Sequence, residues 1–397
     1  MNDLFSRHIA DIVPVIVALR RDLHAHPELA FAEHRTGTKV REYLSALPNV
    51  KLLPPLLGTD VVAILNPDRP GRCVAIRADM DALPIVEETD PAKVPYRSTV
   101  SGVMHACGHD AHTAMLVGTA MVLSRVADQM PGKVKFIFQP GEEDVGGAEG
   151  LCAKGAMANP KVDGIFALHA WPNQPVGMVS LRRGPAMAAS CSFYITVHGQ
   201  GSHGAYPQRG VDPILAAAHI VTALQTIVAR NVAPIDAAVV TVGALSGGVA
   251  SNVIPSECQM KGTIRYLRPE VGEHVQRRVR EIAEHTAVAL GAAAEVRLEA
   301  GCPPTINHER MCDLIERTAR EVLGADWFLG DEPPSLGVED FCYYGEHAPA
   351  AMFRLGVRPF GQESYPPLHN PRFDFNDEAT GRGMQMFCEL ARRFLAT

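Results

Sequence analysis

The feature that most constrains the fold is an alternation of apolar, strand-like runs with helical stretches between residues 72 and 170. The clearest strands are CVAIRA, VKFIFQ and GIFALH, and AHTAMLVGTAMVLSRVA has the length and spacing of a packed helix. Strands that alternate with helices in this way build a mainly parallel sheet covered by helices. We therefore predict an α/β fold for this part of the chain.

The character of the sequence changes near residue 186. CSFYITVHGQ reads as a strand, a helix follows, and two strands, a second helix and the strand AEVRLEA complete a β-α-β-β-α-β series. Beyond residue 303, helical stretches suited to covering a sheet return. We predict a larger domain built from residues 1–185 and 301–397, interrupted at 186–300 by an inserted ferredoxin-like α+β domain.

Size and charge narrow the function classes. A chain of 397 residues exceeds the usual size of one hydrophobic core, which agrees with two domains. The formal net charge of −7 argues against binding to nucleic acid or to an anionic membrane, so a small-molecule substrate is expected. The apolar run at residues 12–19 contains Pro14 and is too short to span a membrane, and we predict an amphipathic helix there.

Cysteine usage favours a reducing environment. The nine cysteines are scattered without a CxxC pair, and an odd number cannot all pair within one chain. We therefore expect a cytoplasmic protein in which most cysteines, such as Cys73 and Cys388, are small buried apolar residues. Cys107 is the exception because of its neighbours.

The segment HACGHDAH concentrates possible metal ligands directly before a predicted helix. It contains His105, Cys107, His109, Asp110 and His112. Imidazole, thiolate and carboxylate are the usual ligands of zinc-like and manganese-like cations, and metal ligation is the favoured interpretation for Cys107 and His109. A polar helix cap with solvated histidines is the alternative, and it suits His105 or His112 well.

A second acidic cluster, GEED, follows the strand VKFIFQ, so Glu142 and Glu143 are expected at the carboxyl edge of the sheet, where open α/β sheets place their sites. Adjacent carboxylates can divide the work: one binds the metal while the other accepts a proton from the attacking water. Taken alone, the pair would rather be a solvated acidic turn.

Other strands lead to the same edge. Asp79 and Asp81 follow CVAIRA, and His169 follows GIFAL. His369, in the loop PPLHNPRFD, is a candidate late ligand, although a lone histidine in a loop is more often structural. Because separate strands deliver Asp, Glu and His to one edge, a metal site there is favoured over each of the single alternatives.

These residues resemble the M20 metallopeptidases, and among them the branch of aminoacylases, hippurate hydrolases and indoleacetyl-amino-acid hydrolases. Seven segments occur in the order of that family: LHAHPE (23–28), RADMDALP (77–84), MHACGHDAH (104–112), PGEE (140–143), GSHGAYP (201–207), SNVIP (251–255) and LHNPRF (368–373). Many M20 enzymes carry His-x-Asp where this chain has Asp79-Met80-Asp81, and an Asp where Cys107 stands. Both departures are typical of the aminoacylase-like branch.

The resemblance implies two divalent metal ions per subunit, Mn²⁺ or Zn²⁺, with Co²⁺ and Ni²⁺ also compatible with these ligands. The implied ligand set is Cys107 as the bridging residue, with His109, Glu143, His169 and His369. Glu142 would then be the general base, and Asp81 would orient His109. The inserted domain resembles the family's lid and dimerisation domain, which implies a homodimer or a tetramer assembled through it.

Three residues of the inserted domain are candidates for contact with substrate. His203, in the Gly-rich segment GQGSHGAYP, could donate a hydrogen bond to the oxyanion that forms as water attacks an amide. Asn252 and Arg265 are candidates to hold the amide and the carboxylate, because the guanidinium fork suits carboxylates. As an isolated residue, His203 would more often be a loop histidine.

The expected reaction is hydrolysis of an N-acyl amino acid, hippurate-like or N-acetyl, to a carboxylic acid and a free amino acid. A metallo-dipeptidase or carboxypeptidase is the alternative among enzymes, because the same centre would hydrolyse a peptide bond. From a different class, the chain could be a binding protein that retains the fold without turnover. Loss of Glu142 or of several ligands would favour that interpretation, and all of them are present.

Overall fold

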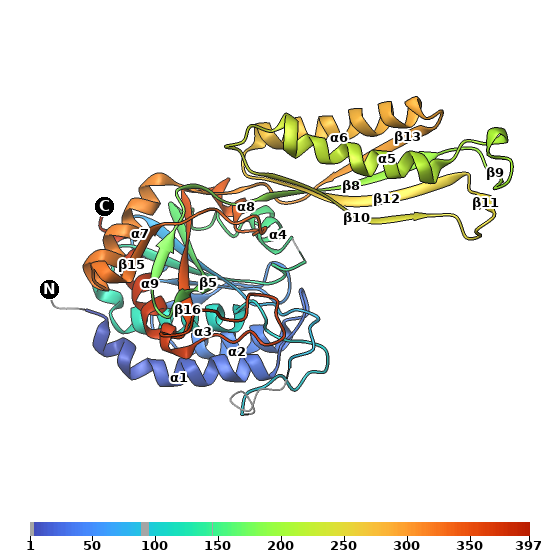
Figure 1. Cartoon of the computed structure of the whole chain (residues 1–397). Helices are drawn as coiled ribbons and strands as arrows, with labels where there is room; N and C mark the ends of the chain where they lie inside the picture. The colour runs from blue at the N-terminus through green and yellow to red at the C-terminus, as the bar shows by residue number, and fades with distance from the viewer. Residues whose placement is uncertain (1–3, 89–94, 145) are drawn as a thin grey trace. The chain divides into compact units, whose positions relative to one another are not determined.

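The computed structural model describes residues 4–88, 95–144 and 146–397, and the chain divides into two compact units (Figure 1). Unit 1 consists of Met1–Gly184, Ile306–Pro333 and Asp340–Thr397. Unit 2 consists of Pro185–Thr305 and Pro334–Glu339. The insertion predicted at residues 186–300 falls within unit 2.

Unit 1 is built on an eight-stranded sheet with the order β1-β2-β4-β3-β5-β16-β6-β15. The strands are β1 (Val50–Leu52), β2 (Val61–Leu65), β3 (Cys73–Asp79), β4 (Lys133–Gln139), β5 (Gly164–Pro175), β6 (Val179–Leu181), β15 (Phe328–Asp331) and β16 (Ala350–Arg358). The central strands β4, β3, β5 and β16 run parallel to one another. Every residue of β3 is buried, as expected where a parallel sheet is covered on both faces. The predicted mainly parallel α/β architecture is confirmed.

Helices of unit 1 pack against this sheet and cover its apolar side chains. They are α1 (Ser6–Ala25), α2 (His34–Ser45), α3 (His109–Arg125), α4 (Gly147–Ala153), α7 (Glu309–Val322), α8 (Cys342–Gly345) and α9 (Thr380–Leu395). α3 packs against both α1 and α9 (Figure 1). It begins at His109 because Gly108 takes a left-handed conformation (φ 93°) that residues with a Cβ rarely adopt. This start places the metal-ligand candidates of HACGHDAH at the end of the sheet.

Unit 2 is a four-stranded antiparallel sheet, β10-β12-β8-β13, with two helices packed on it. Its elements are β8 (Ala189–His198), α5 (Pro213–Thr226), β10 (Ala238–Gly247), β12 (Glu257–Tyr266), α6 (Pro269–Ala289) and β13 (Ala293–Ala300), with a short ladder of β9 (Ser202–His203) and β11 (Val253–Ile254). Along β8 buried and half-buried residues alternate, and Phe193 and Ile195 belong to the core of this unit. The predicted β-α-β-β-α-β series is confirmed. The remaining short strands are β7 (Gly184–Met187) and β14 (Thr305–Asn307).

Among the described residues, one helical stretch, Pro213–Asn231, is long and apolar enough to cross a membrane by length and composition alone. It includes α5, which packs against α6 and β12 within unit 2. The core helices of globular proteins pass the same test, so this stretch is weak evidence for a membrane span.

Candidate metal centre

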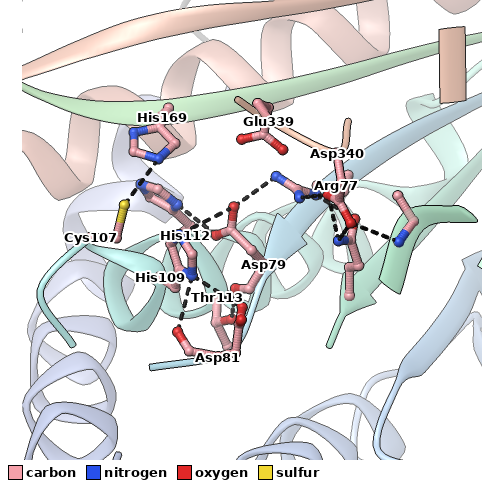
Figure 2. Close-up of polar contacts among 12 residues, drawn as sticks. Arg77, Asp79, Asp81, Cys107, His109, His112, Thr113, His169, Glu339 and Asp340 are labelled. Atoms are coloured by element: carbon pink, nitrogen blue, oxygen red, sulfur yellow. Dashed lines mark hydrogen bonds and ion pairs between the residues drawn. The ribbon is translucent and has the colours of Figure 1, made fainter. Parts of the chain in front are cut away.

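The candidate site of unit 1 lies where the parallel strands end. β3 ends at Asp79, β4 leads at Gln139 into the segment Pro140–Glu143, and His169 lies in the last part of the buried run of β5. α3 starts at the same edge with His109 (Figure 2). Four separate segments therefore bring polar side chains to one place, because the carboxyl ends of parallel strands meet at one edge of a sheet.

Two groups of three side chains share the thiol of Cys107. The donor atoms of Cys107, His109 and His169 lie within 4.8 Å of one another, and so do those of Cys107, Glu143 and His369. Cys107 Sγ is 3.5 Å from His169 Nε2, and His369 Nε2 is 3.3 Å from Glu143 Oε1. The structure thus brings together all five residues predicted as ligands, with Cys107 common to both groups.

Two atoms of this cluster support the presence of a cation. His109 Nε2 and Glu143 Oε1 are buried, and neither has a partner with hydrogen-bond geometry among the described residues. A buried polar atom without a partner costs about 1–3 kcal/mol, so such atoms in a native site call for an explanation. Imidazole nitrogen, thiolate and carboxylate are the donors that zinc-like cations take, and the residues therefore fit a pair of divalent metal ions.

The charged groups around these donor atoms also favour a bound cation. Burial lowers the pKa of His109, but the carboxylates of Asp79, Asp81 and Glu143 outweigh it and raise this pKa to about 10. Burial also lowers the pKa of His169 to about 3, and it raises the pKa of the Cys107 thiol, with the nearby carboxylates adding to the effect. In the protein alone, protons supply the positive charge that these carboxylates require. Bound cations would displace them.

Asp81 holds two of the candidate ligands at once. Its Oδ1 lies 3.2 Å from His109 Nδ1, and its Oδ2 accepts the backbone N–H of Glu143 at 2.8 Å. The first contact is the one expected for a residue that orients His109. The second was not predicted, and it fixes the loop that carries both glutamates.

Glu33 is a buried carboxylate that the sequence interpretation missed. Its Oε1 accepts the backbone N–H groups of Phe31 and Gly141 at 3.0 and 2.9 Å. Gly141 has a φ of 63°, and a Cβ there would lie 2.6 Å from the ring of Phe31. Glu33 therefore anchors the turn that presents Glu142, whose side chain is largely buried beside His109 and Glu143.

Asp110 belongs to neither of the two donor groups that contain Cys107, and its contacts are structural. Its Oδ2 forms an ion pair with Arg20 Nε at 2.9 Å and lies 2.8 Å from His24 Nδ1, and all three side chains are buried. Arg20 also pairs with Asp374, a few residues beyond His369. Through Arg20, helix α1 ties the start of α3 to the loop that carries His369.

The alternative interpretation of His105 and His112 as solvated histidines is wrong, because each is only 1% exposed. Within the part of the chain that the structure describes, both ring nitrogens of His105 lack a hydrogen-bond partner, and burial lowers its pKa to about 4. The exposure of a side chain depends on which segments pack over it. The local sequence therefore could not decide this point.

His369 approaches the cluster from a strained loop position. It is one of the few described non-glycine residues with a positive φ (64°), and its N–H donates to the carbonyl of Ala106 at 2.8 Å. Such backbone conformations cost about 1–3 kcal/mol and cluster at functional sites. The contact with Ala106 places His369 next to Cys107.

The three candidates in unit 2 are not all together. Gly204 donates to the carbonyl of Asn252 at 2.8 Å, so His203 and Asn252 lie at the same end of this unit, by β9 and β11 (Figure 1). Arg265 pairs with Ser190 near the other end of β12. The eight residue steps from Glu257 to Arg265 span about 26 Å at the usual rise of a strand.

Comparison with known proteins shows which family this chain resembles. Residues 75–393 match the profile of peptidase family M20/M25/M40. The N-acetylcysteine deacetylase of Bacillus subtilis (strain 168) is 38% identical over 96% of this chain and 97% of its own length. The thermostable carboxypeptidase 1 of Saccharolobus solfataricus is 35% identical over 97% of each. The solved structure of the Bacillus subtilis YXEP protein, described as a dinuclear metal-binding peptidase from the M20 family, has a TM-score of 0.85 and 35% identity over 98% of this chain and 99% of its own.

Proposed function

Because this chain belongs to peptidase family M20/M25/M40 and is a metal-dependent hydrolase of amides, we propose that its substrates are N-acyl amino acids. Each would be split into a carboxylic acid and a free amino acid. The observation that carries this proposal is the pair of donor groups that share Cys107, with Glu142 beside them. The deacetylase relative supports an acyl amino acid over a longer peptide.

In this proposal Cys107, His109 and His169 hold one divalent ion, and the second is held by Cys107, Glu143 and His369. Zn²⁺, Mn²⁺, Co²⁺ and Ni²⁺ are all compatible with these donors. Such a pair, when bound, polarises the substrate carbonyl and lowers the pKa of water. Glu142 takes the proton of the attacking water and returns it to the departing amine.

His203 is the proposed donor to the oxyanion. The backbone N–H of Ala205 donates to His203 Nδ1 at 3.0 Å, so in the neutral ring the proton sits on Nε2. His203 is exposed, and its Nε2–H is free to donate to a substrate oxygen. Asn252 would bind the amide and Arg265 the carboxylate of the substrate.

We further propose that two subunits pair through unit 2, as a homodimer or within a tetramer. Exposed apolar side chains of this unit include Leu215 of α5, Leu245 of β10 and Val249 in the turn after β10. Such a pair would cover apolar side chains of this kind. Because Arg265 is separated from His203 and Asn252 along the length of β12, one subunit would use its own Arg265 with the His203 and Asn252 of its neighbour.

A reducing, cytoplasmic location also fits the described structure. All nine cysteines are free and buried. Thiols of this kind persist where glutathione and thioredoxin keep proteins reduced. A thiolate that binds metal requires the same conditions.

The proposal predicts a substrate profile. Protein reconstituted with Mn²⁺ or Zn²⁺ should hydrolyse at least one of a set of N-acetyl, N-benzoyl and indoleacetyl amino acids, and a chelator should abolish this activity. Chromatography of the products should show one acyl acid and one amino acid. Release of two amino acids from dipeptides, with no cleavage of the acylated compounds, would favour the carboxypeptidase alternative that the Saccharolobus relative suggests. Metal binding without any turnover would indicate a binding protein.

A second prediction concerns the thiol of Cys107. A thiolate bound to two cations is shielded, and it becomes open to alkylation after chelation. At alkaline pH, iodoacetamide should therefore label Cys107 faster in the chelated protein than in the metal-loaded protein, as measured by peptide mass spectrometry. Alkaline pH is needed because burial raises the pKa of the metal-free Cys107 thiol. Cys191, a buried cysteine of unit 2, is the internal control and should react equally slowly in both. Equal labelling of Cys107 in the two forms would contradict its role as a ligand.

A further inference from the structure

A third group of buried side chains in unit 1 has the composition of a metal site. The donor atoms of Asp79, His109 and His112 lie within 4.8 Å of one another. However, His112 Nδ1 lies 2.7 Å from Asp79 Oδ1 (Figure 2). His112 Nε2 accepts the backbone N–H of Ala170 at 2.9 Å. An Nε2 that accepts an N–H carries no proton, so the proton is on Nδ1 and is donated to Asp79. Neither nitrogen of His112 is left for a cation.

The partner of His112 lies next to a proposed ligand. Ala170 follows His169, and its carbonyl accepts a hydrogen bond from His169 Nδ1 at 2.8 Å. The N–H and the carbonyl of Ala170, the residue after His169, are therefore both held by hydrogen bonds. With its proton on Nδ1, His169 presents Nε2 to Cys107 Sγ at 3.5 Å. The centroid of the His112 ring lies 4.9 Å from that of His169 and 5.5 Å from that of His109, so His112 packs against both imidazoles.

Asp79 is itself fixed by a buried cation. Arg77 Nη1 donates to Asp79 Oδ2 at 2.7 Å, and Arg77 Nη2 donates to Asp340 at 2.9 Å. Arg77 Nε donates to Gln139, which also donates to Asp340. Asp79 Oδ2 thus accepts a hydrogen bond from Arg77, and Asp79 Oδ1 accepts one from His112. A buried charge that is held in this way has one orientation.

We propose that His112, oriented by Asp79 and Arg77, is a positioning residue for the metal site of Cys107, His109 and His169. It acts through Ala170, whose N–H it holds. The site of Cys107, Glu143 and His369 does not depend on it, because other contacts place those side chains. The N–H of Glu143 is held by Asp81, and the N–H of His369 by the carbonyl of Ala106. This inference rests on the two metal sites proposed above.

The experiment isolates each site and measures its affinity for Co²⁺ alone. In a His369→Ala parent, the site with His169 is the intact one, and in a His169→Ala parent, the site with Glu143 is intact. Cys107 is a ligand in both, so the thiolate-to-Co²⁺ absorption reports binding in each titration of the metal-free protein. Introducing His112→Phe keeps an aromatic ring and removes both hydrogen bonds. We expect Co²⁺ affinity to fall by roughly 10–100-fold in the His369→Ala parent, as for other residues that orient ligands. In the His169→Ala parent it should stay within about threefold, because a change below 1 kcal/mol is expected where no contact is lost.

A second pair of variants keeps the test valid if His112→Phe does not fold. An Asn side chain places its amide where His112 Nδ1 is and reaches Asp79, whereas a Gln side chain extends to the position of Nε2 and reaches Ala170. Because the proposed action passes through Ala170, His112→Gln should retain most of the Co²⁺ affinity of the His369→Ala parent, and His112→Asn should lose it. The reverse order would overturn the proposal.

Thr113→Val is the matched control for a lost buried hydrogen bond. Thr113 Oγ1 donates to the carbonyl of Asp79 at 2.7 Å. This hydrogen bond does not involve Ala170. The variant should lower stability and leave Co²⁺ affinity unchanged in both parents. If His112→Phe folds, the proposal is overturned by an equal loss of Co²⁺ affinity in both parents. It is also overturned if Co²⁺ affinity falls in neither parent. Absence of Co²⁺ binding in the parents themselves would overturn the metal assignment and this inference with it.

Discussion

Replacing Glu142 with glutamine is expected to lower kcat by on the order of 10²–10⁴-fold while two metal ions per subunit remain bound. The substitution keeps the size of the side chain and removes the group that accepts a proton from the attacking water. The structure supports separate roles for the two adjacent glutamates. Glu143 Oε1 lies 3.3 Å from His369 and shares a donor group with Cys107, whereas Glu142 belongs to neither group that contains Cys107.

Glu143→Gln is the matched variant, since it makes the same chemical change one residue away. It should lose metal, and elemental analysis of the two purified variants after dialysis separates the cases. An amide is a weaker ligand than a carboxylate for such cations, so the loss should concern the site of Cys107, Glu143 and His369. Full metal content in Glu143→Gln together with metal loss in Glu142→Gln would reverse the two assignments.

The proposed ligands could be predicted because the signal for them is local. Each of Cys107, Glu143 and His169 lies within or next to an element whose type is readable from its apolar pattern. The carboxyl ends of parallel strands meet at one edge, so the order of elements was enough to bring these residues together. The same argument left His369 as a candidate in a loop, and it did not decide which of Glu142 and Glu143 binds metal. The resemblance to a family supplied both assignments.

The supporting residues could not be predicted because their partners are distant in the sequence. Glu33 holds the N–H of Gly141, and Arg77 pairs with Asp340 across 263 positions. No periodicity or spacing marks such contacts, because they depend on which segments the fold packs together. His112 shows the same limit: its neighbours in HACGHDAH allowed both a ligand and a solvated residue, and the structure gives it a buried place with both nitrogens bonded.

His203→Ala is expected to lower kcat by about 10²–10³-fold with metal content unchanged, because the removal of one oxyanion donor typically has this effect. His203 belongs to unit 2, whereas every proposed metal ligand belongs to unit 1. Its side chain is exposed, and its hydrogen bond with Ala205 is a local one, so the substitution should leave stability near that of the parent. Full kcat in His203→Ala on the best substrate found would show that His203 is only a loop histidine.

Mixing inactive chains decides which subunit supplies His203. If it acts in the site of the neighbouring subunit, a dimer of one His203→Ala chain and one Glu142→Gln chain contains one complete site. That site takes Glu142 from the first chain and His203 from the second. With random exchange, half of the dimers are mixed and one of their two sites works, so about a quarter of the parental activity should return. Exchange can be verified by mass spectrometry of differently tagged chains. If each subunit uses its own His203, no mixed dimer contains a complete site, and mixing should restore nothing. Such a result would leave the division of roles between Glu142 and His203 intact and would overturn the proposed sharing of sites through unit 2.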